Sequence, residues 1–150
     1  MDLVKGISRL YLKRSSVIKN DVAFCNKGDL ISPEQAKQLA VDIAREGSGR
    51  VSPNPLVGCV LVDQKHNYIS AGAHLKYGEA HAEVNALSGL EYEDLIGATA
   101  YVTLEPCAHR GKTPSCALLL AKYPFAKIVC GLEDPFELVR GKGFAALQAA

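Results

Sequence analysis

A histidine, a glutamate and two cysteines make up the most reactive pattern in this chain of 150 residues. His81 and Glu83 are one residue apart, and eight residues lie between Cys107 and Cys116. One imidazole and two thiolates are good ligands for zinc, and a catalytic zinc keeps its fourth position for water. The pattern therefore predicts a Zn²⁺ site formed by His81, Cys107 and Cys116. Glu83 is then free to act as the acid and base that moves the protons of the bound water.

Two other interpretations of the same residues stay open. In the first, His109 or His74 is the fourth ligand of a closed, structural zinc site, and Glu83 is only a surface acid. In the second, no metal is bound, and the two thiols are simply buried beside a histidine. Cys59 and Cys130 illustrate the second kind of cysteine, because each lies in an apolar run and is predicted to be a small core residue.

The histidine and the first cysteine are predicted at the ends of two different elements. A helix is predicted over residues 80–89, so His81 lies at its start, where the amide dipoles favour negative charge. A strand is predicted over residues 98–104, so Cys107 lies just past its C-terminal end. Ligand sites in open α/β sheets usually lie at that position. A helix start and a strand end can meet at one point.

The second cysteine is predicted at the start of another helix, over residues 113–122. Thr113 is the predicted cap, and Pro114 fits the first helical position. Cys116 then lies in the first turn, where the partial charge of the helix lowers the pKa of a thiol. This placement favours the thiolate that binds metal.

The remaining elements complete an alternating pattern of strands and helices. Ser32 caps a helix that starts at Pro33 and ends at Gly47, and Gln35 completes a capping box. Further strands are predicted over residues 56–62, 68–74 and 127–132, and a last helix over residues 143–150. An opening hairpin followed by strand–helix units predicts an α/β fold, with helices layered on a mixed central sheet.

Composition indicates one domain without a strongly charged surface. Hydrophobic residues make up 48% of the chain, and 17 basic against 16 acidic residues give a net charge of +1. We therefore expect no nucleic-acid partner and no membrane partner, and no apolar run is long enough to span a bilayer. The five cysteines are odd in number, which in a chain of this class predicts reduced thiols and a cytoplasmic location.

The N-terminal part differs from the rest of the chain. Residues 1–31 are rich in lysine and arginine, with no acid between Asp2 and Asp21. We predict a loosely ordered basic extension there, with a partner-binding arm or a targeting segment as the alternatives. The early Asp2 and the lack of a long apolar core argue against a secretory signal. Residues 32–150 are predicted to form the zinc-dependent domain.

Three motifs follow one another in this second part. Residues 52–58 read Ser-Pro-Asn-Pro-Leu-Val-Gly, residues 81–87 read His-Ala-Glu-Val-Asn-Ala-Leu, and residues 103–116 read Thr-Leu-Glu-Pro-Cys-Ala-His-Arg-Gly-Lys-Thr-Pro-Ser-Cys. Together they resemble the deaminase domain of the bifunctional riboflavin-biosynthesis deaminase/reductase, a member of the cytidine-deaminase-like superfamily. The eight residues between the cysteines are the most discriminating feature, because other deaminases of this superfamily generally have two. The resemblance covers roughly residues 33–150.

The resemblance implies a three-layer α/β/α fold and a specific reaction. The substrate is a small-molecule nucleotide, 2,5-diamino-6-ribosylamino-4(3H)-pyrimidinone 5′-phosphate, which loses its 2-amino group as ammonia. Glu83 would take a proton from the attacking water, pass it to the ring nitrogen and protonate the leaving amine. Deamination of another free base or nucleotide, of cytidine or guanine type, stays open as an alternative. So does a non-catalytic module stabilised by zinc.

Four residues are candidates for binding the substrate. Asn54 offers a donor and an acceptor to the base or the ribose, although an asparagine can also serve only the turn that contains it. His74 matches a family position that faces the ligand, with an exposed residue at the end of a strand as the alternative. Lys112 and Thr113 suit the 5′-phosphate or a ribose hydroxyl.

The chain departs from the family pattern in two places. Asp134-Pro135-Phe136-Glu137 replaces the usual Asp-Pro-Asn-Pro, which puts a ligand contact from this loop in doubt. Family members continue through a last sheet strand into a reductase domain that uses NADPH, whereas this sequence stops at Ala150. We expect a sheet without its last strand, from a truncated domain or one completed by homo-oligomerisation. No reductase activity is expected.

Overall fold

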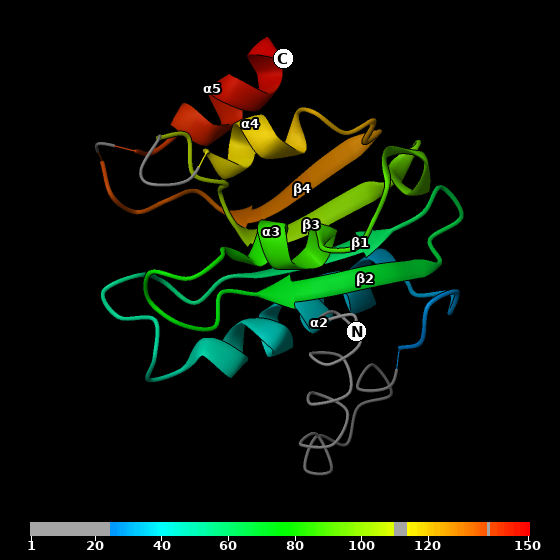
Figure 1. Ribbon diagram of the computed structural model, residues 1–150, viewed down its shortest axis with the longest axis horizontal. Coiled ribbons are helices and arrows are strands. Elements are labelled where there is room, and N and C mark those ends of the chain that lie inside the picture. The colour runs from blue at the N-terminus through cyan, green and yellow to red at the C-terminus, as the bar shows by residue number, and fades with distance from the viewer. Residues whose placement is uncertain (1–24, 110–113, 138) are drawn as a thin grey trace.

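The computed structural model describes residues 25–109, 114–137 and 139–150, and these residues form a four-stranded sheet with helices on both faces (Figure 1). The strand order is β2-β1-β3-β4. β1 pairs antiparallel with both β2 and β3, whereas β3 and β4 are parallel, so the predicted mixed sheet is confirmed. The strands are β1 (Gly58–Val62), β2 (Tyr68–Ala73), β3 (Thr99–Leu104) and β4 (Lys127–Leu132).

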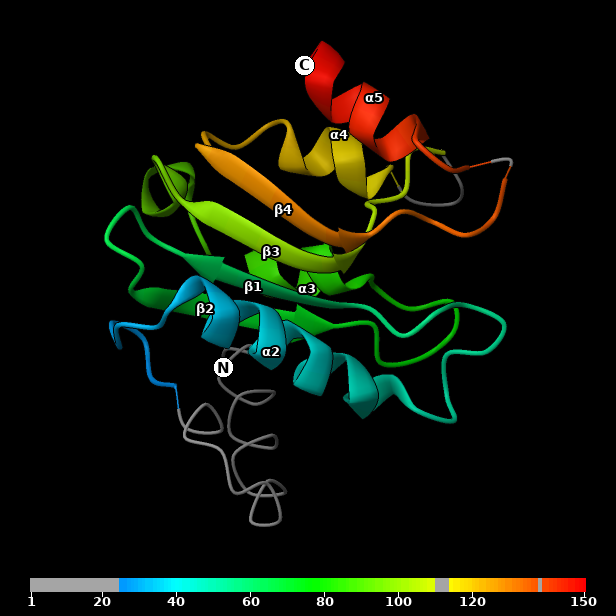
Figure 2. The same ribbon diagram turned by 180° about the vertical axis from the view of Figure 1, so that it is seen from behind.

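The helices lie in two layers, one on each side of the sheet. Figures 1 and 2, which view the molecule from opposite sides, show α2 over one face and α3 with α4 over the other, with α5 beside α4. The α-helices are α2 (Pro33–Ala44), α3 (Ala82–Leu87), α4 (Cys116–Leu120) and α5 (Lys142–Ala149). Two short 3₁₀ helices, η2 (Arg45–Gly47) and η3 (Tyr92–Leu95), complete the described elements. The three-layer α/β/α arrangement is therefore confirmed.

Alternating residues of the strands build a separate core on each face of the sheet. Val60 and Val62 of β1 pack under α2 with Leu39 and Ile43, whereas Leu61 packs on the other side. This alternation is the period of two that a strand imposes on its side chains. Because both faces are covered, every residue of β1 is buried, as the continuous apolar run predicts.

The start of α2 follows the prediction, and its end lies close to the functional site. Ser32 Oγ accepts from the backbone N–H of Gln35 at 3.1 Å, and the Gln35 side chain accepts from Ser32 N–H at 2.8 Å. The α-helix ends at Ala44, earlier than predicted, because a 3₁₀ turn continues the chain to Gly47. A Cβ on Gly47 would lie 2.2 Å from the carbonyl oxygen of His74, so only glycine allows this close approach.

The predicted start of α4 is wrong by several residues. The helix begins at Cys116 and is capped by Ser115, whose Oγ accepts from Leu118 N–H at 3.2 Å. Pro114 precedes this cap and is not the first helical residue, and Thr113 lies outside the described residues. Cys116 nevertheless lies in the first turn, as predicted. The helix over residues 80–89 is also shorter than predicted, since α3 has only six residues.

β4 lies at the edge of the sheet, and this position corrects one prediction. Cys59 is fully buried in β1, but Cys130 in β4 is only partly buried, so it is not a core residue. Leu132 at the end of the same strand is 69% exposed. The described cysteines form no disulfide, in agreement with the prediction of free thiols. Among the described residues, no helix is long and apolar enough to cross a membrane.

The segment just before α2 pairs with the turn between β1 and β2. Tyr68 N–H donates to the carbonyl of Asp29 at 2.7 Å, and Ile31 N–H donates to that of His66 at 3.0 Å. Ile31 is buried in the core under α2. The packed part of the chain therefore includes the last residues of the segment 1–31, whose first 24 residues lie outside the described part.

Candidate active site

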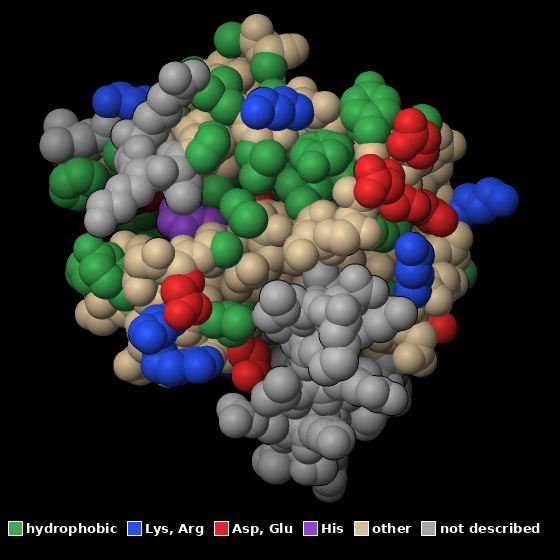
Figure 3. All heavy atoms as spheres, in the orientation of Figure 1, with side chains coloured by type: hydrophobic (Ala, Val, Ile, Leu, Met, Phe, Trp, Pro, Cys, Tyr) green, Lys and Arg blue, Asp and Glu red, His purple; other side chains and the backbone are tan. Residues whose placement is uncertain are grey.

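The residues of the predicted site lie at the edge of the sheet where strands β2, β3 and β4 end. Because β1 runs antiparallel to β2 and β3, and β4 runs parallel to β3, the C-terminal ends of β2, β3 and β4 share this edge with the start of β1. His74 follows β2 and Cys107 follows β3, while α3 and α4 both begin there. In Figure 3, a patch of histidine atoms is visible at the surface on this side of the molecule.

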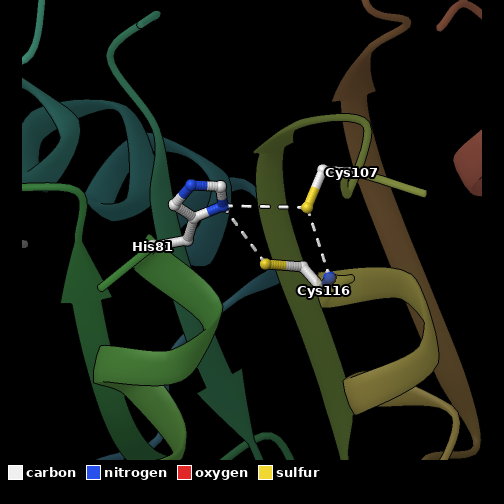
Figure 4. A group of neighbouring side chains, drawn as sticks. All are labelled: His81, Cys107 and Cys116. Carbon is white, nitrogen blue, oxygen red and sulfur yellow. Dashed lines mark hydrogen bonds between the residues drawn. The ribbon is translucent and has the colours of Figure 1, made fainter. Parts of the chain in front are cut away.

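His81, Cys107 and Cys116 come together as predicted (Figure 4). Nδ1 of His81 lies 3.7 Å from the sulfur of Cys107 and 3.4 Å from that of Cys116. The backbone N–H of Cys116 donates to the Cys107 sulfur at 3.3 Å, and Ala117 N–H donates to the Cys107 carbonyl at 3.1 Å. The start of α4 is therefore fastened directly to the segment that carries the other cysteine.

The spacing and the chemistry of these three groups fit a zinc ion. Zinc bound tetrahedrally by nitrogen and sulfur at their usual bond lengths separates the two atoms by about 3.6 Å. The observed nitrogen–sulfur distances of 3.4 and 3.7 Å lie on either side of that value. Among the described residues, the group able to hold a metal consists of these three. His109, one alternative for a fourth ligand, is exposed and lies outside the group.

The thiols of Cys107 and Cys116 affect each other's pKa through a hydrogen bond. Hydrogen bonds, first from the Cys116 thiol and then from His81, lower the pKa of Cys107 to about 4 although burial opposes this. The bond to Cys107 raises the pKa of Cys116, and burial and the neighbouring Glu83 add to that rise. Without a metal, these neighbours therefore oppose the lowering that the helix start was predicted to cause at Cys116. A bound cation would hold both sulfurs as thiolates.

Glu83 lies in the first turn of α3 and is 3% exposed, so it is not a surface acid. Burial is the largest effect on this carboxyl and raises its pKa, and the negative charge of Cys107 adds to the rise. A hydrogen bond from the backbone N–H of Glu83 itself opposes this rise most, followed by the positive His81 and a hydrogen bond with the Cys116 thiol. A buried carboxyl with a raised pKa beside a group of metal-binding residues is a candidate for taking up and releasing protons in a reaction.

The four predicted substrate-binding residues divide into two groups. Asn54 and His74 are brought together at the sheet edge, with Nδ2 of Asn54 3.1 Å from Nε2 of His74. His74 is buried, which excludes the alternative of an exposed residue, and its ring lies 5.1 Å from that of His81. The two ring nitrogens of His74 lie beside Asn54 and the backbone carbonyl of Ala80, so neither nitrogen is placed as a fourth zinc ligand. Lys112 and Thr113 lie outside the described residues.

Glu105 is an important residue that the sequence analysis missed. It is 5% exposed, and its carboxylate accepts four backbone N–H bonds, from 2.7 to 3.2 Å. Burial would raise the pKa of this carboxyl, but the four bonds outweigh burial and lower it. The donors are Asp134, Gly141, Gly143 and Phe144. Glu105 thus ties the segment before Cys107 to the loop after β4 and to the start of α5.

The loop that departs from the family pattern has a local turn of its own. Asp134 Oδ1 accepts from the backbone N–H of Phe136 at 2.9 Å, and the side chain of Phe136 is 61% exposed. Asp134 N–H is one of the donors to Glu105. The backbone of this loop is therefore anchored at the site edge, whereas the side chain of Phe136 is open to solvent.

Comparisons with known proteins agree with this geometry. Residues 31–132 match the family described as the cytidine and deoxycytidylate deaminase zinc-binding region. The riboflavin biosynthesis protein RibD of Bacillus amyloliquefaciens is 50% identical over 78% of this chain and 31% of its own length. A diaminohydroxyphosphoribosylamino-pyrimidine deaminase of Buchnera aphidicola is 43% identical over 73% of each chain. The Acinetobacter baumannii RibD structure covers 76% of this chain and 32% of its own, with 46% identity and a TM-score of 0.71.

The fold and the His-Cys-Cys cluster define a zinc-binding deaminase domain. This chain belongs to the cytidine and deoxycytidylate deaminase family, within which it matches the deaminase domain of the RibD riboflavin-biosynthesis proteins. The chain spans about a third of the length of the RibD relatives it matches. The resemblance inferred from the three sequence motifs is therefore confirmed.

Proposed function

We propose that this chain hydrolyses the 2-amino group of 2,5-diamino-6-ribosylamino-4(3H)-pyrimidinone 5′-phosphate. The products are ammonia and 5-amino-6-(5-phosphoribosylamino)uracil, in riboflavin biosynthesis. The observation that supports this most strongly is the position of the buried Glu83 beside the cluster of His81, Cys107 and Cys116. The similarity to the Buchnera deaminase, over most of both chains, points to the same reaction.

His81, Cys107 and Cys116 would hold the Zn²⁺ through Nδ1 and two sulfur atoms. A zinc ion bound there would supply a water activated for attack on the ring carbon that bears the amino group. The N-terminal ends of α3 and α4 both face this place, and their partial positive charge favours the negative charge of the thiolates. Three ligands leave a coordination position for solvent, as in other catalytic zinc sites.

Glu83 would move the protons in this reaction. Its carboxylate accepts a proton from the attacking water and gives it to the adjacent ring nitrogen. Glu83 would then take the proton of the hydroxyl group added to the ring carbon and give it to the amino nitrogen. The carbon–nitrogen bond breaks, the ring carbonyl forms and ammonia leaves. The raised pKa of Glu83 suits the first step, because it makes the carboxylate a better proton acceptor than an ordinary glutamate.

The four candidate binding residues would hold the nucleotide. Asn54 and His74 lie beside the cluster and would contact the base or the ribose. Lys112 supplies a cation and Thr113 a hydroxyl for the 5′-phosphate or ribose. Together these side chains offer a donor, an acceptor and a positive charge, which match a phosphorylated pyrimidine.

An ammonia-release assay tests the proposal. The zinc-loaded protein should release ammonia from the diaminopyrimidine nucleotide. Prior treatment with a chelator should remove this activity, and added Zn²⁺ should restore it. Cytidine, deoxycytidylate and guanine serve as comparison substrates, and preference for one of them would contradict the proposed substrate. X-ray absorption should find one nitrogen, two sulfurs and one light oxygen around zinc, whereas four protein ligands would indicate a non-catalytic module.

We also propose that the chain forms a homo-oligomer in the cytoplasm. β4 lies at an open edge of the sheet, where Leu132 is 69% exposed, and such edges favour pairing with another chain. The free thiols of the described cysteines suit a reducing compartment. Light scattering of the purified protein measures the oligomeric state, and a monomer at micromolar concentration would contradict the first part.

A further inference from the structure

Asn54 and His74 form a hydrogen-bonded pair beside the metal cluster. Asn54 lies in the loop before β1, and His74 follows β2 directly. The side chain of His74 is 3% exposed, and its ring lies edge-on to that of His81, with 5.1 Å between the centroids and 69° between the planes. The His74 ring therefore packs directly on the imidazole that would bind zinc.

The backbone carbonyl of Ala80 decides which nitrogen of His74 carries the proton. Nδ1 of His74 lies 3.1 Å from that oxygen, and a carbonyl oxygen accepts hydrogen bonds but cannot donate them. Nδ2 of Asn85 donates to the same oxygen at 3.4 Å and to the Ala73 carbonyl at 2.8 Å, so the acceptor is held from a second side. Nδ1 of His74 is therefore the donor, which leaves Nε2 as the nitrogen that can accept a hydrogen bond from Asn54.

An acceptor at Nε2 decides which way the amide of Asn54 faces. Asn54 must turn its Nδ2 group toward His74, and this is the orientation that the structure has. Its Oδ1 is then on the far side of the amide as an acceptor. The backbone N–H of Asn54 separately donates to the Val51 carbonyl at 2.8 Å and supports the turn. The side chain is thus not needed to close the loop.

We propose that His74 is a positioning residue, which holds Oδ1 of Asn54 toward the substrate to accept a hydrogen bond from an N–H or O–H group of the nucleotide. The substrate part of this statement rests on the proposed function, whereas the tautomer of His74 does not. A fixed acceptor also gives selectivity, because a nucleotide that presents an acceptor there would leave both groups unpaired. His74 then acts on the substrate only through Asn54.

Nitrogen-15 NMR of the histidine side chains tests the tautomer without any substrate. In the zinc-loaded protein, Nε2 of His74 should give the signal of an unprotonated ring nitrogen and Nδ1 that of a protonated one. Asn54→Ala should shift the Nε2 signal and leave Nδ1 unchanged, because only one of the two bonds is lost. A proton on Nε2 of His74 in the wild-type protein would overturn the proposal.

A double-mutant cycle tests whether His74 works through Asn54. Asn54→Ala and His74→Phe should each raise KM about tenfold, the effect of losing one hydrogen bond, with zinc content unchanged. Phenylalanine keeps the ring that packs on His81. The double variant should also show about a tenfold rise, because the second change removes a bond that is already lost. Rises that multiply to about a hundredfold would show that His74 acts independently of Asn54, and would overturn the proposal.

A second histidine provides the matched control. His66 lies in the turn between β1 and β2, at the opposite edge of the sheet, with Nε2 3.5 Å from the hydroxyl of Tyr101. Its positive φ of 64° is a conformation that asparagine tolerates, so His66→Asn should fold and keep the wild-type KM. If His74→Phe does not fold, the wild-type NMR spectrum and Asn54→Ala still decide the proposal. If the protein releases no ammonia, the proposed function fails, while the spectrum still decides the tautomer.

Discussion

Two buried glutamates lie at the same edge of the sheet and have opposite properties. Glu83 is 3% exposed and Glu105 is 5% exposed, and each lies two residues from a member of the metal cluster. Burial raises the pKa of Glu83, whereas four backbone N–H bonds lower the pKa of Glu105 despite burial. The difference has two causes: Glu83 lies deeper in the protein, where burial raises its pKa more strongly, and Glu105 accepts four backbone N–H bonds that lower its pKa.

This difference separates a group that can exchange protons from one that holds the structure. The bonds to Glu105 come from the loop after β4 and the start of α5, and they favour its charged form. The backbone amide that acts on the Glu83 carboxyl is its own, and its pKa also responds to Cys107, His81 and Cys116. Low solvent exposure alone therefore does not identify a carboxyl that can exchange protons, because the depth of burial and the donors around the carboxyl both shift its pKa.

Glu83→Gln should give the largest effect on activity. Glutamine has the same shape but cannot exchange a proton, so kcat should fall by roughly 10²- to 10⁴-fold. The bound zinc, measured by metal analysis, should remain at one ion per chain, and thermal stability should not fall, because a buried charge is removed. Glu79→Gln, on an exposed side chain nearby, is the control and should keep full activity. Activity near the wild-type level in Glu83→Gln would refute the proposed mechanism.

Glu105→Gln should lower stability and leave most of the activity of the folded protein. The amide NH₂ group of glutamine donates hydrogen bonds and cannot accept them from backbone N–H groups. Some of the four buried N–H groups would therefore lose their acceptor, and the free energy of unfolding should fall by about 3 kcal/mol. Denaturant unfolding measures this change. The folded fraction of the variant should keep much of the wild-type kcat, because Glu83 is unchanged. Glu133→Gln, an exposed neighbour, is the matched control and should change stability by less than about 0.5 kcal/mol.

The pH dependence of stability sharpens the same comparison. The pKa of Glu105 is lower in the folded protein than the ordinary value of 4.5, so its stabilising effect is complete above pH 4.5. It is lost as the pH falls through the lower, native pKa. The difference in unfolding free energy between wild type and Glu105→Gln should therefore be constant near neutral pH and shrink in acid. A difference that grows on acidification would contradict the charged form of Glu105.

The sequence was sufficient for the zinc cluster and Glu83 but not for Glu105. The His-x-Glu and Pro-Cys motifs are local patterns with a known chemical use, and the bounds of β4 follow from an apolar run between polar residues. The donors to Glu105 are backbone amides 29 to 39 positions away, and no residue type announces them. Only the folded chain brings these groups together.

Two further differences between prediction and structure have the same origin. Thr113 and Ser115 are both good caps, and the choice of Ser115 depends on Cys107, whose sulfur and carbonyl accept the first free amides of α4. The exposure of Cys130 depends on the strand order, which places β4 at an edge, and not on the residues of β4. Local signals predict where elements lie, whereas contacts between distant segments decide their ends and their exposure.

Gly143→Ala tests how closely the start of α5 must approach Glu105. A Cβ at this position would lie 2.1 Å from the carbonyl oxygen of Pro106 and 3.0 Å from Oε1 of Glu105. The start of α5 must move away, which should lower the free energy of unfolding by about 2 kcal/mol. The loss should be smaller in a Glu105→Gln background, because part of the same contact is already broken. Simple addition of the two losses would show that Gly143 and Glu105 do not act together.

Ser115→Ala should give the smallest loss of stability, with a specific effect on metal binding. Ser115 Oγ accepts from Leu118 N–H at 3.2 Å, and losing a helix cap of this kind costs about 1 kcal/mol. Because Cys116 is the next residue, the first turn that positions its sulfur loosens, and Zn²⁺ affinity measured by competition with a chelator should fall. Ser32→Ala removes the cap of α2, away from the cluster, and should cost similar stability with unchanged zinc affinity. Equal zinc affinity in the two variants would mean that the contacts with Cys107 alone hold Cys116 in place. The α4 cap would then play no part in positioning the zinc ligands beside Glu83.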